Sequence, residues 1–352
     1  MIRMHNRPIL ILLSAVAAAG LAMTGCMAVQ PSDPVVQESR PGGNTDAAVD
    51  STGYDPEDNL GSDAGSVSED GLEGNKGDIT ADETSAKENS MPENGYTYTT
   101  KEIRCQNGKN SIYGIAYIPD TGSRKLPLVI FSHELGCSHT NGIPYAERLA
   151  ENGYAAYIFD FCGGSVGREN KSDGKNTEMS VMTEVSDIEA IIEAAAAWDF
   201  VDPDRIVLLG ASQGGTATAL AACRHEDKVA GMIMMYPALC LFSDVHAMFG
   251  DNIENVPDEF YMLGGYIRVG KNYATDAWDV DVYDELSRYG KKVLLLHGDR
   301  DNVVNISYSD RAATVIPDCE YTVIEGAGHG FANASFEEAM ALILRYLDDV
   351  IQ

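Results

Sequence analysis

The chain has 352 residues, of which 44% are hydrophobic, and its net charge is −29. This length allows one large or two small domains, and the apolar content can bury a sizeable core. So negative a charge argues against nucleic acid as a partner and against electrostatic attraction to anionic lipid headgroups. It does not identify a substrate.

Residues 1–25 are typical of an export signal. Arg3 and Arg7 precede an apolar stretch, residues 8–22, that is too short for a good membrane span. Residues 23–26 (MTGC) then resemble a bacterial lipobox, whose cysteine is diacylated and becomes the mature N-terminus, although methionine stands where leucine is usual. We therefore expect an exported protein held at a bacterial membrane by a lipid on Cys26. The alternative is an ordinary secretory signal with an incidental cysteine.

Residues 26–95 are predicted to form a disordered acidic tether. From residue 27 to 95 there are sixteen acidic residues, three basic ones, and a single aromatic residue, Tyr54. Such a segment cannot bury enough apolar surface to offset the entropy lost on ordering. The folded domain is accordingly expected over residues 96–352. An acidic binding segment is the alternative to a tether.

Six cysteines follow Cys26, and their spacing matches no metal-binding or redox pattern. They are Cys105, Cys137, Cys162, Cys223, Cys240 and Cys319. Several lie in or beside apolar runs, where a buried free thiol is expected, although one disulfide is an alternative in an exported protein. The sequence also lacks a phosphate loop and a dinucleotide fingerprint, so we expect no cofactor and no metal.

The pattern of elements predicts a mainly parallel sheet covered by helices on both faces. Residues 96–103 and 112–118, with a turn signal between them, indicate an antiparallel hairpin. Helical spacing of apolar residues predicts a helix over residues 178–198. Repeated strand–helix units after the hairpin indicate the parallel sheet. The further strands are expected at residues 126–132, 153–161, 206–209, 229–236, 292–297 and 320–325.

Residues 206–220 (IVLLGASQGGTATAL) give the strongest chemical signal. An apolar strand, a tight turn and a helix surround Ser212, with Gly210 and Gly214 on either side, which is the nucleophile-elbow pattern G-x-S-x-G. Glycines are needed because Cβ atoms would clash in so sharp a turn. The N–H of Gln213 lies in the first helical turn without an intrahelical partner, so it can bind a developing oxyanion. A chance match in a glycine-rich protein is the alternative.

Two loops after later strands complete a candidate catalytic triad. Asp301 follows the strand ending in His-Gly, and His329 lies on a glycine-rich loop after the last strand. Serine, acid and histidine in this order are expected when all three occupy one edge of such a sheet. His329 would take the proton of Ser212, and Asp301 would fix the histidine tautomer. Asp299 is the competing acid; a loop histidine and a helix cap are the non-catalytic alternatives.

These residues resemble the α/β-hydrolase superfamily and are most similar to its bacterial cinnamoyl and feruloyl esterase branch, over about residues 96–346. The matching motifs are residues 172–175, 210–215, 298–304 and 328–330. The resemblance implies an eight-stranded, mostly parallel sheet with a small cap inserted at about residues 238–288, after the sixth strand. It also implies the triad Ser212, Asp301 and His329, with the N–H groups of Leu135 and Gln213 as oxyanion donors.

One residue departs from the family pattern in the first oxyanion loop. Glu134 stands where glycine is usual. If the backbone there needs a positive φ, a glutamate costs about 1 kcal/mol or more, and its carboxylate would repel an oxyanion unless it points away. Glu134 could instead act as a hydrogen-bond partner behind the site.

Substrate contacts are expected from the oxyanion loop and the cap. We expect His133, Glu134, Tyr236 and Trp278 to line the substrate site, since aromatic walls suit a planar phenolic or other apolar acyl group. The alternative is that most aromatic residues of the cap form its own small core.

The function expected from these features is that of a serine carboxylic-ester hydrolase, which acts on a small-molecule ester through an acyl-enzyme. The resemblance points to small or medium acyl esters, with hydroxycinnamoyl esters as the narrower expectation. A serine peptidase of the prolyl-oligopeptidase type has the same elbow, although no propeller is recognised in this sequence. A non-catalytic surface lipoprotein that uses the fold as a binding module is a third hypothesis. The sequence does not indicate an oligomeric state.

Overall fold

The computed structural model describes residues 95–351 except 124 and 167–169, so the predicted signal, Cys26 and nearly all of the predicted tether lie outside the described residues. Eight strands form the main sheet. They are β1 (Tyr98–Asn107), β2 (Asn110–Pro119), β3 (Leu126–Ser132), β4 (Ala155–Phe159), β5 (Val201–Ala211), β6 (Gly231–Met235), β9 (Val293–Gly298) and β10 (Cys319–Ile324).

The strands follow the order β1-β2-β4-β3-β5-β6-β9-β10. β1 pairs with β2 and β2 with β4 in antiparallel fashion, and every later pair is parallel. The predicted hairpin and the mainly parallel eight-stranded sheet are therefore confirmed. The central strands β3 and β5 are apolar along most of their length because they are covered on both faces.

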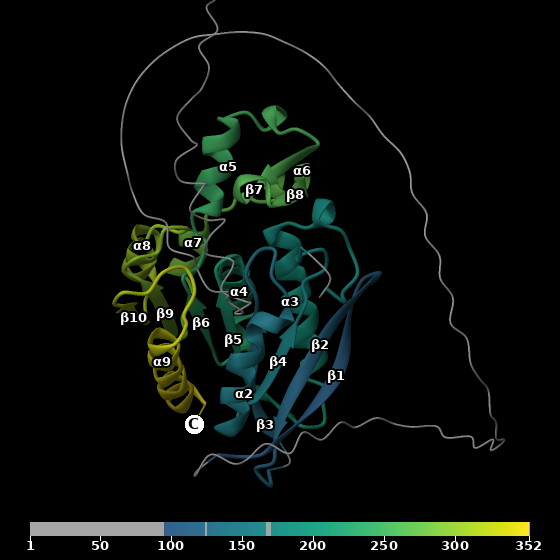
Figure 1. Cartoon of the computed structure of the whole chain (residues 1–352), viewed down its shortest axis with the longest axis vertical. Helices are drawn as coiled ribbons and strands as arrows, with labels where there is room; N and C mark the ends of the chain where they lie inside the picture. Colours follow the sequence, from purple (N-terminus) through teal and green to yellow (C-terminus); the bar gives the residue numbers. More distant parts are fainter. Residues whose placement is uncertain (1–94, 124, 167–169, 352) are drawn as a thin grey trace, which may run out of the picture. The chain divides into compact units, whose positions relative to one another are not determined.

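Helices cover both faces of this sheet, as the strand–helix rhythm predicted (Figure 1). One apolar cluster packs α3, α4, α7 and α8 against one face, and a second packs α2 and α9 against the other. The bounds are α2 (Ile143–Glu151), α3 (Val181–Ala195), α4 (Gln213–Arg224), α7 (Val282–Ser287), α8 (Ser307–Val315) and α9 (Ala334–Val350). None of the helices in the described residues combines the length and apolar character that crossing a bilayer requires.

The chain between β6 and β9 carries the inserted cap. It contains α5 (Leu241–Phe249), β7 (Glu259–Met262), β8 (Ile267–Gly270) and α6 (Lys271–Thr275), with β7 and β8 paired in a separate small sheet. Figure 1 shows these elements beyond the carboxyl ends of the strands, next to α3 and α4. The cap has a small core of its own, Val245, Val256 and Ala274.

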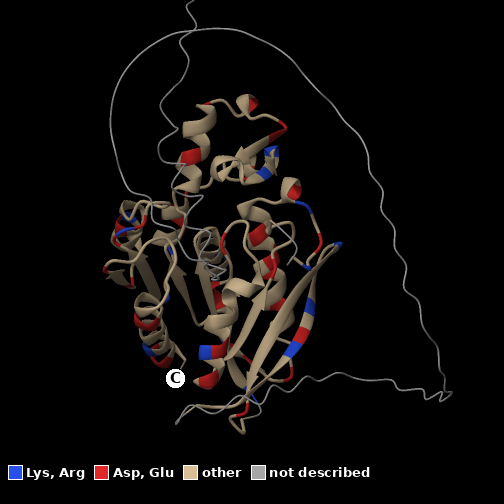
Figure 2. Cartoon of the chain, in the orientation of Figure 1, with Lys and Arg blue, Asp and Glu red and all other residues tan. Residues whose placement is uncertain are grey.

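Acidic residues lie on many of the outer helices and loops (Figure 2). Of the cysteines, Cys105 and Cys162 are buried free thiols, as expected for cysteines in or beside apolar runs, and burial raises the pKa of both. The described residues contain no group of three or more His, Cys, Asp or Glu side chains arranged to hold a metal ion.

A buried carboxylate–histidine contact joins the loops that follow β3 and β4. Asp160, at the end of β4, accepts hydrogen bonds from the backbone N–H and the Nδ1–H of His139, each 2.8 Å long. Its second carboxylate oxygen accepts the N–H of Lys171 at 2.8 Å. Burial alone would raise the pKa of Asp160, but the hydrogen bonds from His139 and Lys171 outweigh it and lower the pKa. The pair fixes the loop that continues from the predicted oxyanion residues.

Removing the carboxylate should destabilise the fold strongly. Asp160→Ala leaves the backbone N–H and the ring N–H of His139 buried without an acceptor, so the free energy of unfolding should fall by about 3 kcal/mol or more. Because the pKa of Asp160 is lowered, its contribution is present above about pH 4 and is lost as the pH falls further. Urea denaturation of wild type and variant measures both effects.

Asp202→Ala is the matched control, because Asp202 pairs with Arg205 at 2.8 Å where both side chains are partly exposed to solvent. Its cost should be only about 0–1 kcal/mol. Equal losses in the two variants would contradict a structural role for the buried pair.

Candidate active site

Ser212 lies at a strained turn between β5 and α4. Its backbone has φ 53° and ψ −122°, outside the regions that residues other than glycine favour, and the residue is 7% exposed. A Cβ on Gly210 would lie 2.4 Å from the carbonyl oxygen of Gly214, and one on Gly214 would lie 2.3 Å from that of His133. The two glycines are therefore required, and the second lets α4 approach the loop after β3.

The structure brings the three predicted triad residues together. His329 Nε2 lies 2.8 Å from Ser212 Oγ, and His329 Nδ1 lies 2.7 Å from Asp301 Oδ2. The side chain of Asp301 is fully buried; burial alone would raise its pKa, but hydrogen bonds from His297 and His329 lower it strongly. An ionised carboxylate can only accept, so Nδ1 of His329 carries the proton. Its Nε2 is then free to accept the proton of Ser212.

The competing acid does not reach His329. Asp299 is exposed and accepts the N–H of Gly326 at 2.6 Å. Asp301 is held by the N–H groups of Val303 and Val304, at 2.8 and 2.9 Å. The geometry therefore selects Asp301.

The sequence-based prediction missed His297, which supports Asp301 from behind. His297 Nε2 lies 3.2 Å from Asp301 Oδ2 and 3.1 Å from the carbonyl oxygen of Val304, so this nitrogen carries a proton. Nδ1 then accepts the hydroxyl of Ser309 at 2.8 Å. The sequence feature that could have identified it is a histidine at the end of a predicted strand, four residues before the catalytic acid.

The two predicted oxyanion donors have backbone N–H groups that are available to bind an oxyanion. Neither the N–H of Leu135 nor that of Gln213 has a hydrogen-bond acceptor among the residues that the structure describes. Gln213 opens α4, where the helix dipole also favours a negative charge. The close approach of Gly214 to the carbonyls of Ser132 and His133 places the loop that carries Leu135 beside this helix start.

Glu134 does not strain the oxyanion loop. It is absent from the non-glycine residues with positive φ in the described chain, and the positive φ of this loop, 77°, belongs to Gly136. The Glu134 carboxylate accepts the hydroxyl of Tyr236 at 3.1 Å, and the Tyr236 ring packs edge-on against His329 with 4.9 Å between ring centres. This geometry agrees with the hypothesis of a hydrogen-bond partner behind the site, and Tyr236, 2% exposed, is a support for His329.

Two of the expected substrate contacts lie elsewhere. His133 is 1% exposed; its Nδ1–H donates to the carbonyl of Glu134 at 2.8 Å, and its Nε2 accepts the N–H of Phe161 at 3.2 Å. Burial lowers its pKa, so it is a neutral ring that holds the loop. Trp278 packs beside the small core of the cap, and its ring lies tilted against that of His246 with 4.4 Å between ring centres. The alternative that cap aromatics form the cap's own core therefore describes Trp278 better.

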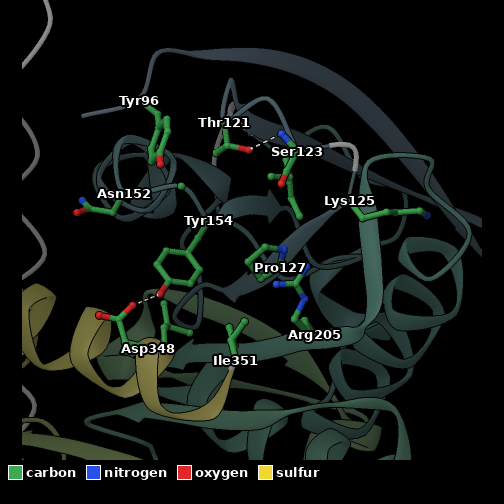
Figure 3. Close-up of a pocket in the computed structure, with 13 residues that line it drawn as sticks. Tyr96, Thr121, Ser123, Lys125, Pro127, Asn152, Tyr154, Arg205, Asp348 and Ile351 are labelled. Carbon is green, nitrogen blue, oxygen red and sulfur yellow. Dashed lines mark hydrogen bonds between the residues drawn. The ribbon is translucent and has the colours of Figure 1, made fainter. Parts of the chain in front are cut away.

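A surface cavity of about 300 Å³ lies far from this chemistry. Leu126 and Tyr154, which line it, stand at the amino ends of β3 and β4, whereas Ser212 and His329 lie beyond the carboxyl ends of the strands. Figure 3 shows Tyr154 donating to Asp348 at the cavity wall. None of the triad residues lines it, so we do not assign the reaction to this cavity.

Replacing each carboxylate in turn tests the choice of acid. A fluorophosphonate probe reacts with an activated serine, since its fluoride leaves as the serine oxygen bonds to phosphorus and the base takes the serine proton. Asp301→Asn should slow labelling of Ser212 by about 10³- to 10⁴-fold because it removes the group that fixes the His329 tautomer.

Asp299→Asn, two residues away, should leave the labelling rate near that of wild type. Labelling rates measured by gel fluorescence would contradict the assignment if the two variants behaved alike or in the reverse order.

Curated relatives match parts of the chain. Quorum-quenching protein AidA of Acinetobacter baumannii is 30% identical over 125 residues, which are 35% of this chain and 39% of that protein. Alpha/beta hydrolase domain-containing protein 17C of Xenopus tropicalis is 29% identical over 211 residues, 57% of this chain and 55% of that protein. The chain thus spans about half or less of the length of the curated relatives it matches.

Solved structures match the folded part as a whole. Est1E from Butyrivibrio proteoclasticus, solved with bound ferulic acid, is 26% identical with a TM-score of 0.64, covering 71% of this chain and 99% of that one. Mouse alpha/beta hydrolase domain-containing protein 10 is 21% identical with a TM-score of 0.57, over 71% and 99% of the two chains, and shows the fold alone. The expected α/β-hydrolase fold is confirmed.

The family match covers more than half of the chain, residues 144–352, and includes Ser212, Asp301 and His329. With this span and the eight-stranded sheet in place, the chain belongs to the prolyl oligopeptidase family (peptidase S9) and has the α/β-hydrolase fold.

Proposed function

We propose that this hydrolase-family protein is a serine carboxylic-ester hydrolase that acts on small or medium acyl esters. The observation that carries the proposal is the unbroken hydrogen-bonded chain from Ser212 through His329 to Asp301. In such a chain the serine oxygen attacks the ester carbonyl while His329 takes its proton, and His329 then protonates the departing alcohol. A water activated by His329 releases the acid from the acyl-enzyme in the second half of the cycle.

Two charges develop in the transition state, one on the oxyanion and one on the imidazolium, and each has its own stabilising group. The N–H groups of Leu135 and Gln213 are proposed to bind the oxyanion, and the ionised Asp301 stabilises the imidazolium of His329. No step requires a cofactor. Hydroxycinnamoyl esters are our narrower substrate proposal, supported by the likeness to Est1E with its bound ferulic acid.

Peptide-bond hydrolysis is the second candidate, and the family match favours it. The same triad can cleave an amide if His329 protonates the leaving amine. The two activities differ in which substrate the cap and oxyanion loop admit, so paired substrates can separate them.

A paired assay tests both candidates. Wild type should hydrolyse p-nitrophenyl acetate, p-nitrophenyl butyrate and methyl ferulate with kcat/KM far above that for an aminoacyl-anilide. Ser212→Ala should lower ester turnover by at least about 10³-fold, because the nucleophile is lost while the fold is kept. Circular dichroism controls for folding.

Faster cleavage of the anilide would favour the peptidase. No Ser212-dependent turnover of any substrate would favour a non-catalytic binding module.

We further propose that the protein is exported and anchored to a bacterial membrane by a lipid on Cys26, on the strength of residues 1–26 alone. Radiolabelled palmitate should be incorporated into wild type and not into Cys26→Ser, and the variant should move from the membrane to the soluble fraction. Cys319→Ser is the matched control and should keep both label and location. Membrane retention of Cys26→Ser without label would contradict lipid anchoring.

A further inference from the structure

A buried carboxyl group lies directly behind the nucleophile elbow and takes no part in the triad. Glu184, in the first turn of α3, is 1% exposed. Its Oε1 accepts the side-chain N–H of Gln213 at 3.0 Å, and its Oε2 is buried with no hydrogen-bond partner among the described residues. Gln213 is also the residue whose backbone N–H we assign to the oxyanion.

The other end of the Gln213 amide reaches the cap. Tyr273, on α6 and 1% exposed, donates its hydroxyl to Gln213 Oε1 at 2.5 Å. The remaining amide proton points at the sulfur of Met179, 3.7 Å away. Both N–H groups and the oxygen of this side chain therefore have a partner, and Gln213 forms a buried bridge between Glu184 on α3 and Tyr273 on α6.

The part of the cap that holds Tyr273 is docked firmly on the core. Asp276 accepts the hydroxyl of Ser180 at 2.7 Å, and Asn272 donates to the carbonyl of Met179 at 3.1 Å. A Cβ on Gly270 would lie 2.2 Å from the carbonyl oxygen of Thr177, so the backbones meet closely there. These contacts hold Tyr273 in a fixed position relative to the core.

The Gln213 bridge can hold the backbone of the elbow in place, which matters because the adjacent residue, Ser212, is strained. A non-glycine residue with φ 53°, as at Ser212, costs about 1–3 kcal/mol and persists only where its surroundings over-determine it. Gln213 follows Ser212 directly, so fixing its side chain also fixes the direction of its backbone N–H.

We propose that Glu184, acting through the side chain of Gln213, is a positioning residue that aims the oxyanion-binding N–H of Gln213, and that Tyr273 couples this N–H to the cap. The inference rests on the proposed ester hydrolysis and deepens it. Neither residue touches the reacting atoms. Helix α6 of the cap and the start of α4 are thereby joined into one unit.

The protonation state of Glu184 determines whether the bridge supports or opposes binding of the oxyanion by Gln213. Burial raises its pKa to about 8, so it is neutral at lower pH. The groups facing it are Asp187 on its own helix, Gln213 on α4 and Tyr273 on α6, and none of them is a cation. Ionisation above about pH 8 would place a negative charge behind the oxyanion donor and oppose the developing oxyanion. Activity should therefore fall on the alkaline side.

Kinetics of variants against pH test the inference. Glu184→Ala should lower kcat for p-nitrophenyl butyrate by about tenfold or more with KM within about twofold, because the loss is confined to the transition state. Tyr273→Phe should lower kcat by a smaller factor. Glu184→Gln, which mimics the neutral acid, should keep kcat near wild type at pH 7 and remove the alkaline fall. Glu193→Gln, at an exposed position on the same helix, should change neither.

Fluorophosphonate labelling of Ser212 gives a second readout that needs no natural substrate, and it should follow the same order. If Glu184→Ala does not fold, the pH profile of Glu184→Gln still decides. The inference would be overturned if kcat of Glu184→Gln fell at alkaline pH as much as that of wild type. It would also be overturned if Glu184→Ala kept the wild-type kcat. A wild-type chain that neither labels nor hydrolyses esters would instead contradict the proposed function.

Discussion

The backbone at Ser212 is the constraint on which the site depends. A serine held at φ 53° projects its hydroxyl above the carboxyl edge of the sheet only if α4 can start at once. That start requires Gly214, whose missing Cβ lets the helix lie against the carbonyls of Ser132 and His133. The same close approach brings the loop after β3 beside the start of α4, so the strained turn places both the proposed nucleophile and the proposed oxyanion donors.

Two carboxyl groups near this turn are pushed in opposite directions by their surroundings. Hydrogen bonds from His297 and His329 keep Asp301 ionised, whereas burial keeps Glu184 neutral to about pH 8. An anion is useful beside an imidazolium and harmful behind an oxyanion donor. Asp301 is therefore ionised beside the imidazole that would become positive, and Glu184 is neutral behind the N–H that we propose binds the oxyanion.

Patterns local in sequence predicted the scaffold well. Residues 126–132 match β3 in full, since an apolar run between polar turns leaves little choice, and the elbow follows from glycine spacing. Apart from the triad, whose meeting the motifs and their chain order predicted, contacts between distant residues were beyond such patterns. Glu184 and Tyr273 are 89 positions apart (273 − 184 = 89), and only the packed structure shows that both bond to Gln213. The role of His133 was predicted wrongly for the same reason, because its hydrogen-bond donor, the N–H of Phe161, lies just after a different strand, β4.

A crystal structure of the chain after reaction with a p-nitrophenyl phosphonate tests the central claim most directly. The adduct should be on Ser212 Oγ, with its phosphonyl oxygen about 3 Å from the N–H groups of both Leu135 and Gln213 and with His329 still bonded to Asp301. An adduct on another residue would contradict the claim. So would a phosphonyl oxygen that points away from these two N–H groups.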